Sequence, residues 1–413
     1  MGWNPTPGNP SLLKELNQFL ILDALRRYGS LSRSDLARIT GLTPPTVGVI
    51  VKGLLEEGYL VEQASLPGSG VGRRPVPLAL NPQAGIAVGV NVSPTKVLIL
   101  AVNLLGQIQA RRSFAIAAGA SAEDVLEQVI GNVREMLAEL RPRRVFGVGV
   151  GLHGPVDHQR GLLRFAPHLG WRNVPVADLL GAALPGPVVV DNGVRCMAQG
   201  ELWFGAARGI ENLVCVAVGT GIGAAIVLDG RLYRGADGIA GEIGHVTVDV
   251  EGPRCDCGNY GCLETLASGP AIARQAARRL KQGVPSLLVD WGLDPDSLAA
   301  ADVARAALAG DELSRQVFAE AGMYLGIAIA NLAKTLNPSR ILIGGGVAQA
   351  GDLLLEPLRR TLAQRTEGLL PGEVPVEPIQ LGADAGAIGA ACLVLERFFR
   401  GDTVPQILDF IER

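Results

Sequence analysis

The chain has 413 residues, of which 48% are hydrophobic and 19% charged, and its formal net charge is -3. This length suffices for two or three folded domains with a sizeable core. No apolar run approaches the length that spans a bilayer and no signal-peptide pattern opens the chain, so we expect a cytoplasmic protein with no membrane partner. A near-neutral net charge does not exclude a local basic surface, and therefore does not exclude nucleic-acid binding.

The N-terminal region is predicted to form a helix-turn-helix. Apolar residues recur at helical spacing over residues 12–28, and Gly29 ends that helix. Two further helices follow around a turn, and the second of them carries Pro44 and Pro45 in its first turn, with Thr43 as its N-cap. This last helix would lie in the major groove, with Thr43, Thr46 and Lys52 as candidate DNA contacts.

A glycine-rich stretch over residues 67–75 distinguishes this region from a bare helix-turn-helix, which is also a common packing motif. It follows an extended segment and has the character of the wing of a winged DNA-binding module. Its tip presents Arg73 and Arg74, which could neutralise phosphates or enter a minor groove. The wing favours DNA binding.

Two similar hairpins indicate a duplicated α/β fold. Residues 86–106 are two apolar strands around a polar turn, and residues 213–230 repeat that plan. Each hairpin is followed by helix and strand patterns, which predicts two lobes with a cleft between them. The remaining cysteines, Cys196, Cys215 and Cys392, lie in apolar sequence and are expected in the core.

A histidine and three cysteines are spaced as a metal site. Cys255, Cys257 and Cys262 stand close together, with His245 ten residues upstream of the first. Three thiolates and one imidazole form a closed tetrahedral zinc site. A disulfide is the alternative, but Cys-x-Cys residues are poorly placed to pair and nothing indicates an oxidising compartment.

The same stretch offers groups for a hydroxyl-rich ligand. Glu242 and His245 are three residues apart, and Glu264 closely follows the last cysteine. Carboxylates accept hydrogen bonds from sugar hydroxyls, and a histidine whose first ring nitrogen holds zinc can turn the second toward a ligand. A purely structural role, as groups that support or cap the zinc site, stays equally open.

The motifs Glu242-Ile-Gly-His245 and Cys255-Asp-Cys-Gly-Asn-Tyr-Gly-Cys-Leu-Glu264 resemble the signature of the ROK family (repressors, open reading frames and sugar kinases). The resemblance extends over nearly the whole chain. It implies an actin-like (RNase H-like, duplicated) two-lobed sugar kinase fold, preceded here by the winged helix-turn-helix. Ser32 and Arg33 are similar to the first DNA-binding helix of ROK repressors and join the candidate DNA contacts, whereas Gly48 replaces a usual serine.

The resemblance also implies that two parts of the kinase machinery are lost. The first phosphate loop of the family reads Asp-x-Gly-Gly-Thr-Lys, and this chain has Asn91 for the aspartate and Pro94 for a glycine, which removes an N–H donor. The catalytic aspartate position of the family is Gly193, which cannot accept a proton. Asp191, two residues earlier in the chain, could in principle take its place.

Other ligand positions of the family are kept. Asn192 joins Glu242, His245 and Glu264 as an implied effector-binding residue, and residues 219–223 match the second phosphate loop. His168 stands where the family usually has asparagine, and His153 and His158 are expected in loops or at the surface.

These features predict a transcriptional regulator, most simply a repressor of sugar-metabolism genes, with a sugar effector bound in a ROK domain that lacks catalysis. Two alternatives stay open: an active sugar kinase with an added DNA-binding domain, and a repressor controlled by a protein partner. We expect operator DNA as a partner, a homodimer or dimer of dimers, structural zinc and no ATP requirement. The expected domains are residues 1–80 (winged helix-turn-helix), 81–192 with about 383–400 (first lobe), 193–382 (second lobe with zinc) and 401–413 (tail).

Overall fold

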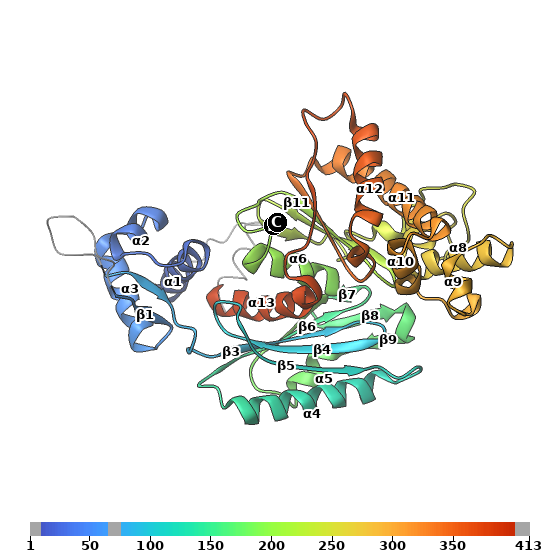
Figure 1. Cartoon of the computed structure of the whole chain (residues 1–413). Helices are drawn as coiled ribbons and strands as arrows, with labels where there is room; N and C mark the ends of the chain where they lie inside the picture. Colours follow the sequence, from blue (N-terminus) through green and yellow to red (C-terminus); the bar gives the residue numbers. More distant parts are fainter. Residues whose placement is uncertain (1–9, 65–75, 401–413) are drawn as a thin grey trace, which may run out of the picture. The chain divides into compact units, whose positions relative to one another are not determined.

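The computed structural model describes residues 10–64 and 76–400, and these divide into two compact units (Figure 1). The first unit contains the chain up to Phe204 together with the residues from Gly386 onward, and the second contains Gly205–Ala385. Arg73, Arg74 and the predicted tail 401–413 lie outside the described residues.

The N-terminal part of the first unit is a helix-turn-helix closed by a strand pair, as predicted. Ser32 caps α2 in a capping box with Asp35, Gly41 ends that helix with φ 71°, and Thr43 caps α3 ahead of two prolines. The strands β1 and β2 pair antiparallel, and the wing segment between them falls in the gap in the described chain. The elements are α1 (Pro10–Tyr28), α2 (Arg33–Thr40), α3 (Pro44–Glu56), β1 (Leu60–Glu62) and β2 (Leu78–Leu80).

A five-stranded sheet in the order β10-β6-β3-β4-β5 forms the centre of the first unit. Helix α4 (Ala122–Leu140) and α5 (Val176–Gly181) cover one face, and α6 (Gly193–Phe204) and α13 (Ala385–Arg400) cover the other (Figure 1). A small sheet of β7 (Val156–Asp157), β8 (Leu162–Ala166) and β9 (Trp171–Val174) flanks it. The central strands are β3 (Ile86–Val92), β4 (Lys96–Val102), β5 (Ile108–Ala115), β6 (Val145–Leu152) and β10 (Val188–Asn192).

The second unit repeats this plan with the order β13-β12-β11-β14-β15. In both sheets the first three strands form an antiparallel meander. The fourth strand pairs in parallel with the first strand of the meander, and the fifth pairs in parallel with the fourth. The predicted duplication is therefore confirmed. The strands are β11 (Leu213–Val218), β12 (Ile222–Leu228), β13 (Arg231–Tyr233), β14 (Arg340–Gly344) and β15 (Val376–Pro378). The main helices are α7 (Leu263–Ala267), α8 (Gly269–Lys281), α9 (Leu287–Asp290), α10 (Ala300–Leu308), α11 (Glu312–Leu336) and α12 (Asp352–Thr366).

Two expectations about the chain's organisation need correction. Helix α6 was assigned to the second lobe, but it lies in the first unit, since Cys196 on this helix packs on Gly151 of β6 and on Gly389 of α13.

The second correction concerns the expectation that no apolar run approaches the length of a membrane span. Helix α11 has 25 residues and a window of mean hydropathy 1.2, so by length and composition it resembles a membrane span. It is nevertheless a core helix, with 56% of that window buried, and it packs closely on α12 through Gly322.

Candidate functional site

The four predicted metal ligands form one cluster in the second unit. Their ligand atoms all lie within 4.8 Å of one another, with His245 Nδ1 3.6 Å from Cys255 Sγ and Cys257 Sγ 3.7 Å from Cys262 Sγ. A tetrahedral zinc with Zn–S bonds of about 2.3 Å places two sulfurs roughly 3.8 Å apart and a sulfur and a nitrogen slightly closer. The donor set and its spacing therefore fit such an ion.

The backbone holds this cluster tightly against strand β12. Gly258 and Gly261 have φ values of 92° and 61°, so the predicted tight turns between the cysteines are present. A side chain at Gly244 would meet the carbonyl of Ile222, and one at Gly241 would meet that of Ala224. The segment that carries the histidine can approach the sheet only because these positions lack a Cβ.

The pKa values of the cluster's thiols are shifted by their surroundings. Burial, aided by the neighbouring cysteines, raises the pKa of the Cys262 thiol to about 12. The backbone N–H of Asn259 lowers the pKa of the exposed Cys257. Metal ligation requires thiolates, so binding of a divalent ion would release protons from this cluster.

The predicted effector residues of the second unit lie beside the metal cluster. Glu242 immediately precedes the one-turn helix Ile243–His245, so it shares a side of that turn with His245. Since the Nδ1 atom of His245 faces Cys255, its Nε2 atom is the nitrogen left for a ligand. Glu264 lies in the first turn of α7 and accepts a hydrogen bond of 2.9 Å from the Ile222 N–H, at the end of the loop 219–223. Glu264 thus ties the second phosphate-loop segment to the metal-site segment.

The first unit brings together the positions implied to have lost kinase chemistry. The Asn91 side chain lies 2.9 Å from where a Cβ on Gly386 would stand and 3.3 Å from the equivalent points on Gly193 and Gly151. Asp191 is buried and its carboxylate forms an ion pair of 2.8 Å with Arg195. The polar groups at this end of the sheet are therefore packed and paired within the protein.

The side chain of Asn192, the effector residue predicted in the first unit, forms hydrogen bonds with two backbone groups. Its side-chain amide donates to the Gly154 carbonyl at 3.0 Å and its oxygen accepts from the Val194 N–H at 2.8 Å. Each amide end retains one further hydrogen-bonding position. Asn192 is fixed in orientation rather than excluded from ligand binding.

Two histidines that the sequence did not connect lie together in the first unit. The rings of His153 and His168 are 5.1 Å apart, although His153 was expected only as a loop or surface residue. Burial, with the nearby His168 as a smaller cause, lowers the pKa of His153 to about 4. His153 is therefore uncharged at neutral pH and partly buried, whereas its neighbour His168 is exposed.

The predicted DNA-binding side chains differ in how strongly the protein itself engages them. Ser32 is 8% exposed and its hydroxyl takes part in the α2 capping box, which favours a capping role over a DNA contact. Arg33 forms an ion pair of 3.0 Å with Glu62 and Lys52 one of 3.8 Å with Glu56, with all four side chains largely exposed. The hydroxyls of Thr43 and Thr46 lie 2.8 Å apart at the start of α3. These five assignments stay predictions, as do those of Arg73 and Arg74, which lie outside the described residues.

Comparison with known proteins matches both parts of this architecture. Residues 87–397 match the ROK family and residues 15–68 match the MarR family. The chain belongs to the ROK family. A xylose repressor of Caldicellulosiruptor bescii is 31% identical over 94% of this chain and 97% of its own length. A solved ROK family transcriptional regulator, described as a homolog of the E. coli MLC protein, superposes with a TM-score of 0.82 at 29% identity, covering 94% of this chain and 97% of that chain.

The ROK family also contains kinases, and one of them is similar to this chain over a shorter stretch. A glucokinase of Halalkalibacterium halodurans is 41% identical over 61% of this chain and 77% of its own length. The chain therefore shares the ROK domain with both repressors and kinases, while the relatives cited above that extend across its N-terminal domain are a repressor and a regulator.

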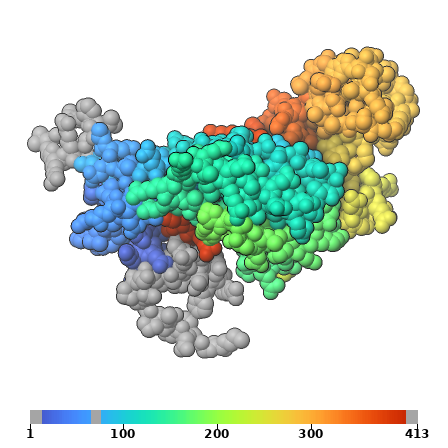
Figure 2. Space-filling model, turned by 90° about the horizontal axis from the view of Figure 1, so that it is seen from below, coloured from blue at the N-terminus to red at the C-terminus, as the bar shows by residue number. Residues whose placement is uncertain are grey.

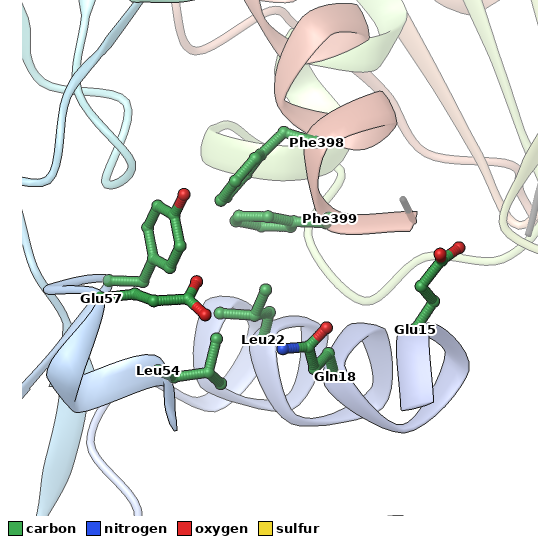
Figure 3. A pocket seen from close by; sticks show the side chains of 8 residues that line it. Glu15, Gln18, Leu22, Leu54, Glu57, Phe398 and Phe399 are labelled. Carbon is green, nitrogen blue, oxygen red and sulfur yellow. The ribbon is translucent and has the colours of Figure 1, made fainter. Parts of the chain in front are cut away.

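One feature of the ROK domain that sequence reasoning missed is the contact between α13 and the DNA-binding head. Figures 1 and 2 show α13 in red beside the blue head. The Phe398 ring lies 4.9 Å from Tyr59 and 4.5 Å from Phe146, and the Phe399 ring stacks on Trp203 at 5.5 Å. The phenylalanines stand over Leu22 of α1 and Leu54 of α3, where they line a surface hollow (Figure 3). The adjacent Phe398-Phe399 pair is the sequence signal that could have pointed to this contact.

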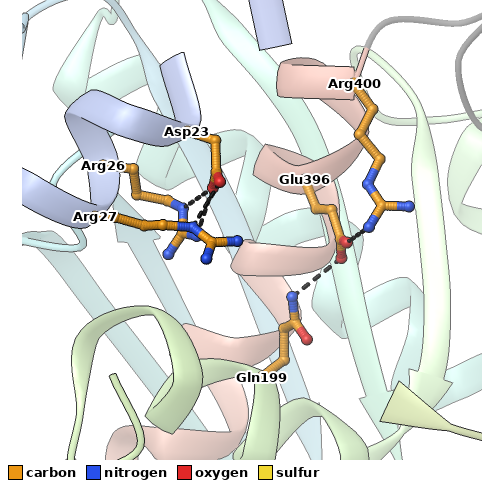
Figure 4. Close-up of polar contacts among 6 residues, drawn as sticks. All are labelled: Asp23, Arg26, Arg27, Gln199, Glu396 and Arg400. Carbon is orange, nitrogen blue, oxygen red and sulfur yellow. Dashed lines mark hydrogen bonds and ion pairs between the residues drawn. The ribbon is translucent and has the colours of Figure 1, made fainter. Parts of the chain in front are cut away.

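Polar contacts surround the aromatic cluster. Gln199 of α6 donates to Glu396 at 3.0 Å, and Arg400 pairs with the other oxygen of that carboxylate at 2.6 Å (Figure 4). Arg26 of α1 lies 4.4 Å over the Trp203 ring and is oriented by Asp23. The end of α13 is thereby fixed to both α6 and the head.

Proposed function

We propose that this ROK protein is a cytoplasmic, sequence-specific transcriptional repressor of sugar-metabolism genes whose operator binding is controlled by a sugar. The observation that carries the proposal is the joining of a winged helix-turn-helix to a ROK domain, with 31% identity to a xylose repressor across both parts. We also propose that it acts as a homodimer or dimer of dimers, since a two-fold protein would match a near-palindromic operator.

The ROK domain is proposed to bind a sugar without phosphorylating it. Asn91 cannot supply the carboxylate that serves the metal ion of a kinase, Pro94 has no N–H for a phosphate, and Gly193 has no proton acceptor. Asp191, two residues before Gly193 in the sequence, has its carboxylate in a buried ion pair with Arg195. The identity to a glucokinase favours the rival kinase function, which a coupled ATPase assay decides. Sugar-dependent ATP turnover would establish the rival, and its absence would support a sensor.

The metal cluster is proposed to bind structural zinc through His245, Cys255, Cys257 and Cys262. Zinc held at Nδ1 would fix the imidazole ring and present Nε2 to the effector, beside the carboxylates of Glu242 and Glu264. Asn192 is the proposed effector contact of the first unit. The zinc ion would supply orientation and stability rather than catalysis, because its four protein ligands leave no open coordination position.

Helix α13 is the proposed route from the effector residues to the DNA-binding head. Its first turn packs on Asn91 of β3, which pairs with Gly151 of β6, and Gly151 pairs in turn with Asp191, the residue before Asn192 on β10. Its last turn packs on Tyr59 of the head. Gly89 and Gly149 allow the helix to lie directly on the sheet, since a Cβ at either would meet an α13 carbonyl. A small displacement at the first turn would therefore reach the head through one rigid element.

The proposal is tested by titrating the purified protein onto its own upstream intergenic DNA, with and without a panel of monosaccharides. We expect tight binding that one sugar weakens, and loss of that response in Glu242→Ala and Glu264→Ala. Unchanged release in both variants would contradict the effector assignment. Tight binding that no sugar alters would favour control by a protein partner.

A further inference from the structure

Helix α3 has two faces of different character. Its apolar face packs into the head, with Val47, Ile50, Val51 and Leu54 buried. The opposite face points to solvent, and its members recur at three- and four-residue spacing as Pro45, Gly48, Val49 and Lys52. The second face is the one that a winged helix-turn-helix presents to the major groove.

The protein's own packing explains neither Val49 nor Gly48. Val49 is 75% exposed, and valine forms helices less readily than alanine or lysine because its branched side chain is restricted at χ1. A Cβ on Gly48 would meet no atom within 4 Å, yet glycine is less favourable than alanine inside a helix. Contact with a surface outside this chain would account for both residues.

Hydrogen-bonding side chains on and beside this face are already engaged. The Thr46 hydroxyl lies 2.8 Å from that of Thr43, and Lys52 pairs with Glu56. The apolar Val49 lies on this face between Pro45 and the exposed Lys52. In the major groove the apolar feature that distinguishes one base from the others is the 5-methyl group of thymine.

We propose that Val49 reads a thymine 5-methyl group in the operator and that Gly48 lets the helix approach the base edges closely. The inference rests on the proposed function, because it takes α3 as the recognition helix. The preference for thymine at this operator position would then come from van der Waals contact between Val49 and the methyl group, rather than from a hydrogen bond.

The experiment uses the full chain and an operator enriched from random duplex DNA. Each thymine is then replaced singly by deoxyuridine, which removes only the methyl group. We expect one position in each half-site at which this replacement weakens wild-type binding about four-fold, the effect of losing one buried methyl group. Val49→Ala is expected to bind the thymine and deoxyuridine duplexes equally, while Val289→Ala, at a valine 55% exposed in the second unit, retains the four-fold difference.

The outcomes separate this inference from the proposed function. Failure to enrich any sequence overturns both. An enriched operator that tolerates deoxyuridine at every position overturns the inference alone, and so does a deoxyuridine effect that persists unchanged in Val49→Ala. Circular dichroism of each variant checks that the head is folded, and Val49→Thr, which keeps one methyl group, is expected to retain part of the discrimination.

Discussion

The two units share one strand plan but use the polar groups at the ends of their strands differently. In the second unit the turn between β11 and β12 keeps its glycines, and Glu264 joins it to the metal cluster. In the first unit the turn between β3 and β4 is closed by Ser93, whose N–H and hydroxyl both donate to the Lys96 carbonyl. The first unit also holds Asp191 in a buried ion pair, whereas in the second unit Glu242 and Glu264 belong to the segments that carry His245 and Cys262.

This difference indicates that the duplicated halves have diverged in role. Polar groups of the first unit hold the sheet, α6 and α13 in place, and α13 connects them to the head. In the second unit the proposed metal ligands lie close to Glu242 and Glu264, two of the proposed effector residues. Changes among the first unit's packed polar groups should therefore alter stability without altering metal content, whereas changes at the second unit's cluster should alter metal binding as well as stability.

The largest effect is expected at the metal cluster. Cys262→Ser removes a buried thiolate ligand, and we expect loss of bound zinc with a loss of stability on the order of 5 kcal/mol, because structural zinc contributes directly to folding. Metal analysis of the purified protein and urea unfolding measure both quantities. Treatment of the wild type with a strong chelator should lower its Tm in the same direction.

The matched control is Cys215→Ala, a buried cysteine of β11 in the same unit but outside the cluster. It should keep one equivalent of zinc and cost only about 1 kcal/mol, as an ordinary core substitution does. Equal zinc content in Cys262→Ser and wild type would contradict the metal assignment.

A loss of about 3–5 kcal/mol is expected for Arg195→Met in the first unit. Removing the guanidinium takes away the ion-pair partner of a carboxylate that is 1% exposed, and an uncompensated buried charge is costly. The double variant Asp191→Asn with Arg195→Met should recover much of this loss in a double-mutant cycle. If the single variant were as stable as wild type, the ion pair would not be the structural element that distinguishes this unit.

The sequence predicted those parts of the molecule that depend on local spacing. The caps of α2 and α3, the duplicated hairpins and the Cys/His cluster all follow from short-range patterns, and the structure contains each of them. Contacts between distant segments were not predictable in the same way. Arg195 is four residues from Asp191, but whether a helix turns that pair inward depends on tertiary packing. The contact of Phe398 with Tyr59 joins residues over 300 positions apart, and the adjacent Phe398-Phe399 pair marks an aromatic site without indicating its partner.

A smaller effect is expected from the pH dependence of stability. The pKa of His153 is lowered to about 4 in the folded protein, below its ordinary value of 6.5. Between these values the unfolded chain binds a proton that the folded chain does not, so stability falls as the pH falls. We expect a loss on the order of 2 kcal/mol between pH 7.5 and pH 5 from this residue.

Urea unfolding of wild type and His153→Asn at several pH values isolates this contribution. The variant should lose less stability on acidification, while His158→Asn, a loop histidine close by in sequence, should behave as wild type does. A slope in His153→Asn equal to that of wild type would show that another group controls the acid side of the stability curve.

The smallest change tests whether Glu264 supports the loop, binds the ligand, or does both. Glu264→Gln keeps an oxygen that accepts from the Ile222 N–H, so its stability should lie within about 0.5 kcal/mol of wild type. Glu264→Ala leaves that N–H without this acceptor and should cost about 1–3 kcal/mol. Sugar affinity, measured by calorimetry on the sugar that releases the operator, should fall at least ten-fold in both, because charge-assisted hydrogen bonds are the stronger ones. If Glu264→Gln kept full sugar affinity, the carboxylate would serve the loop alone, and the ligand surface of the second unit would reduce to Glu242 and His245.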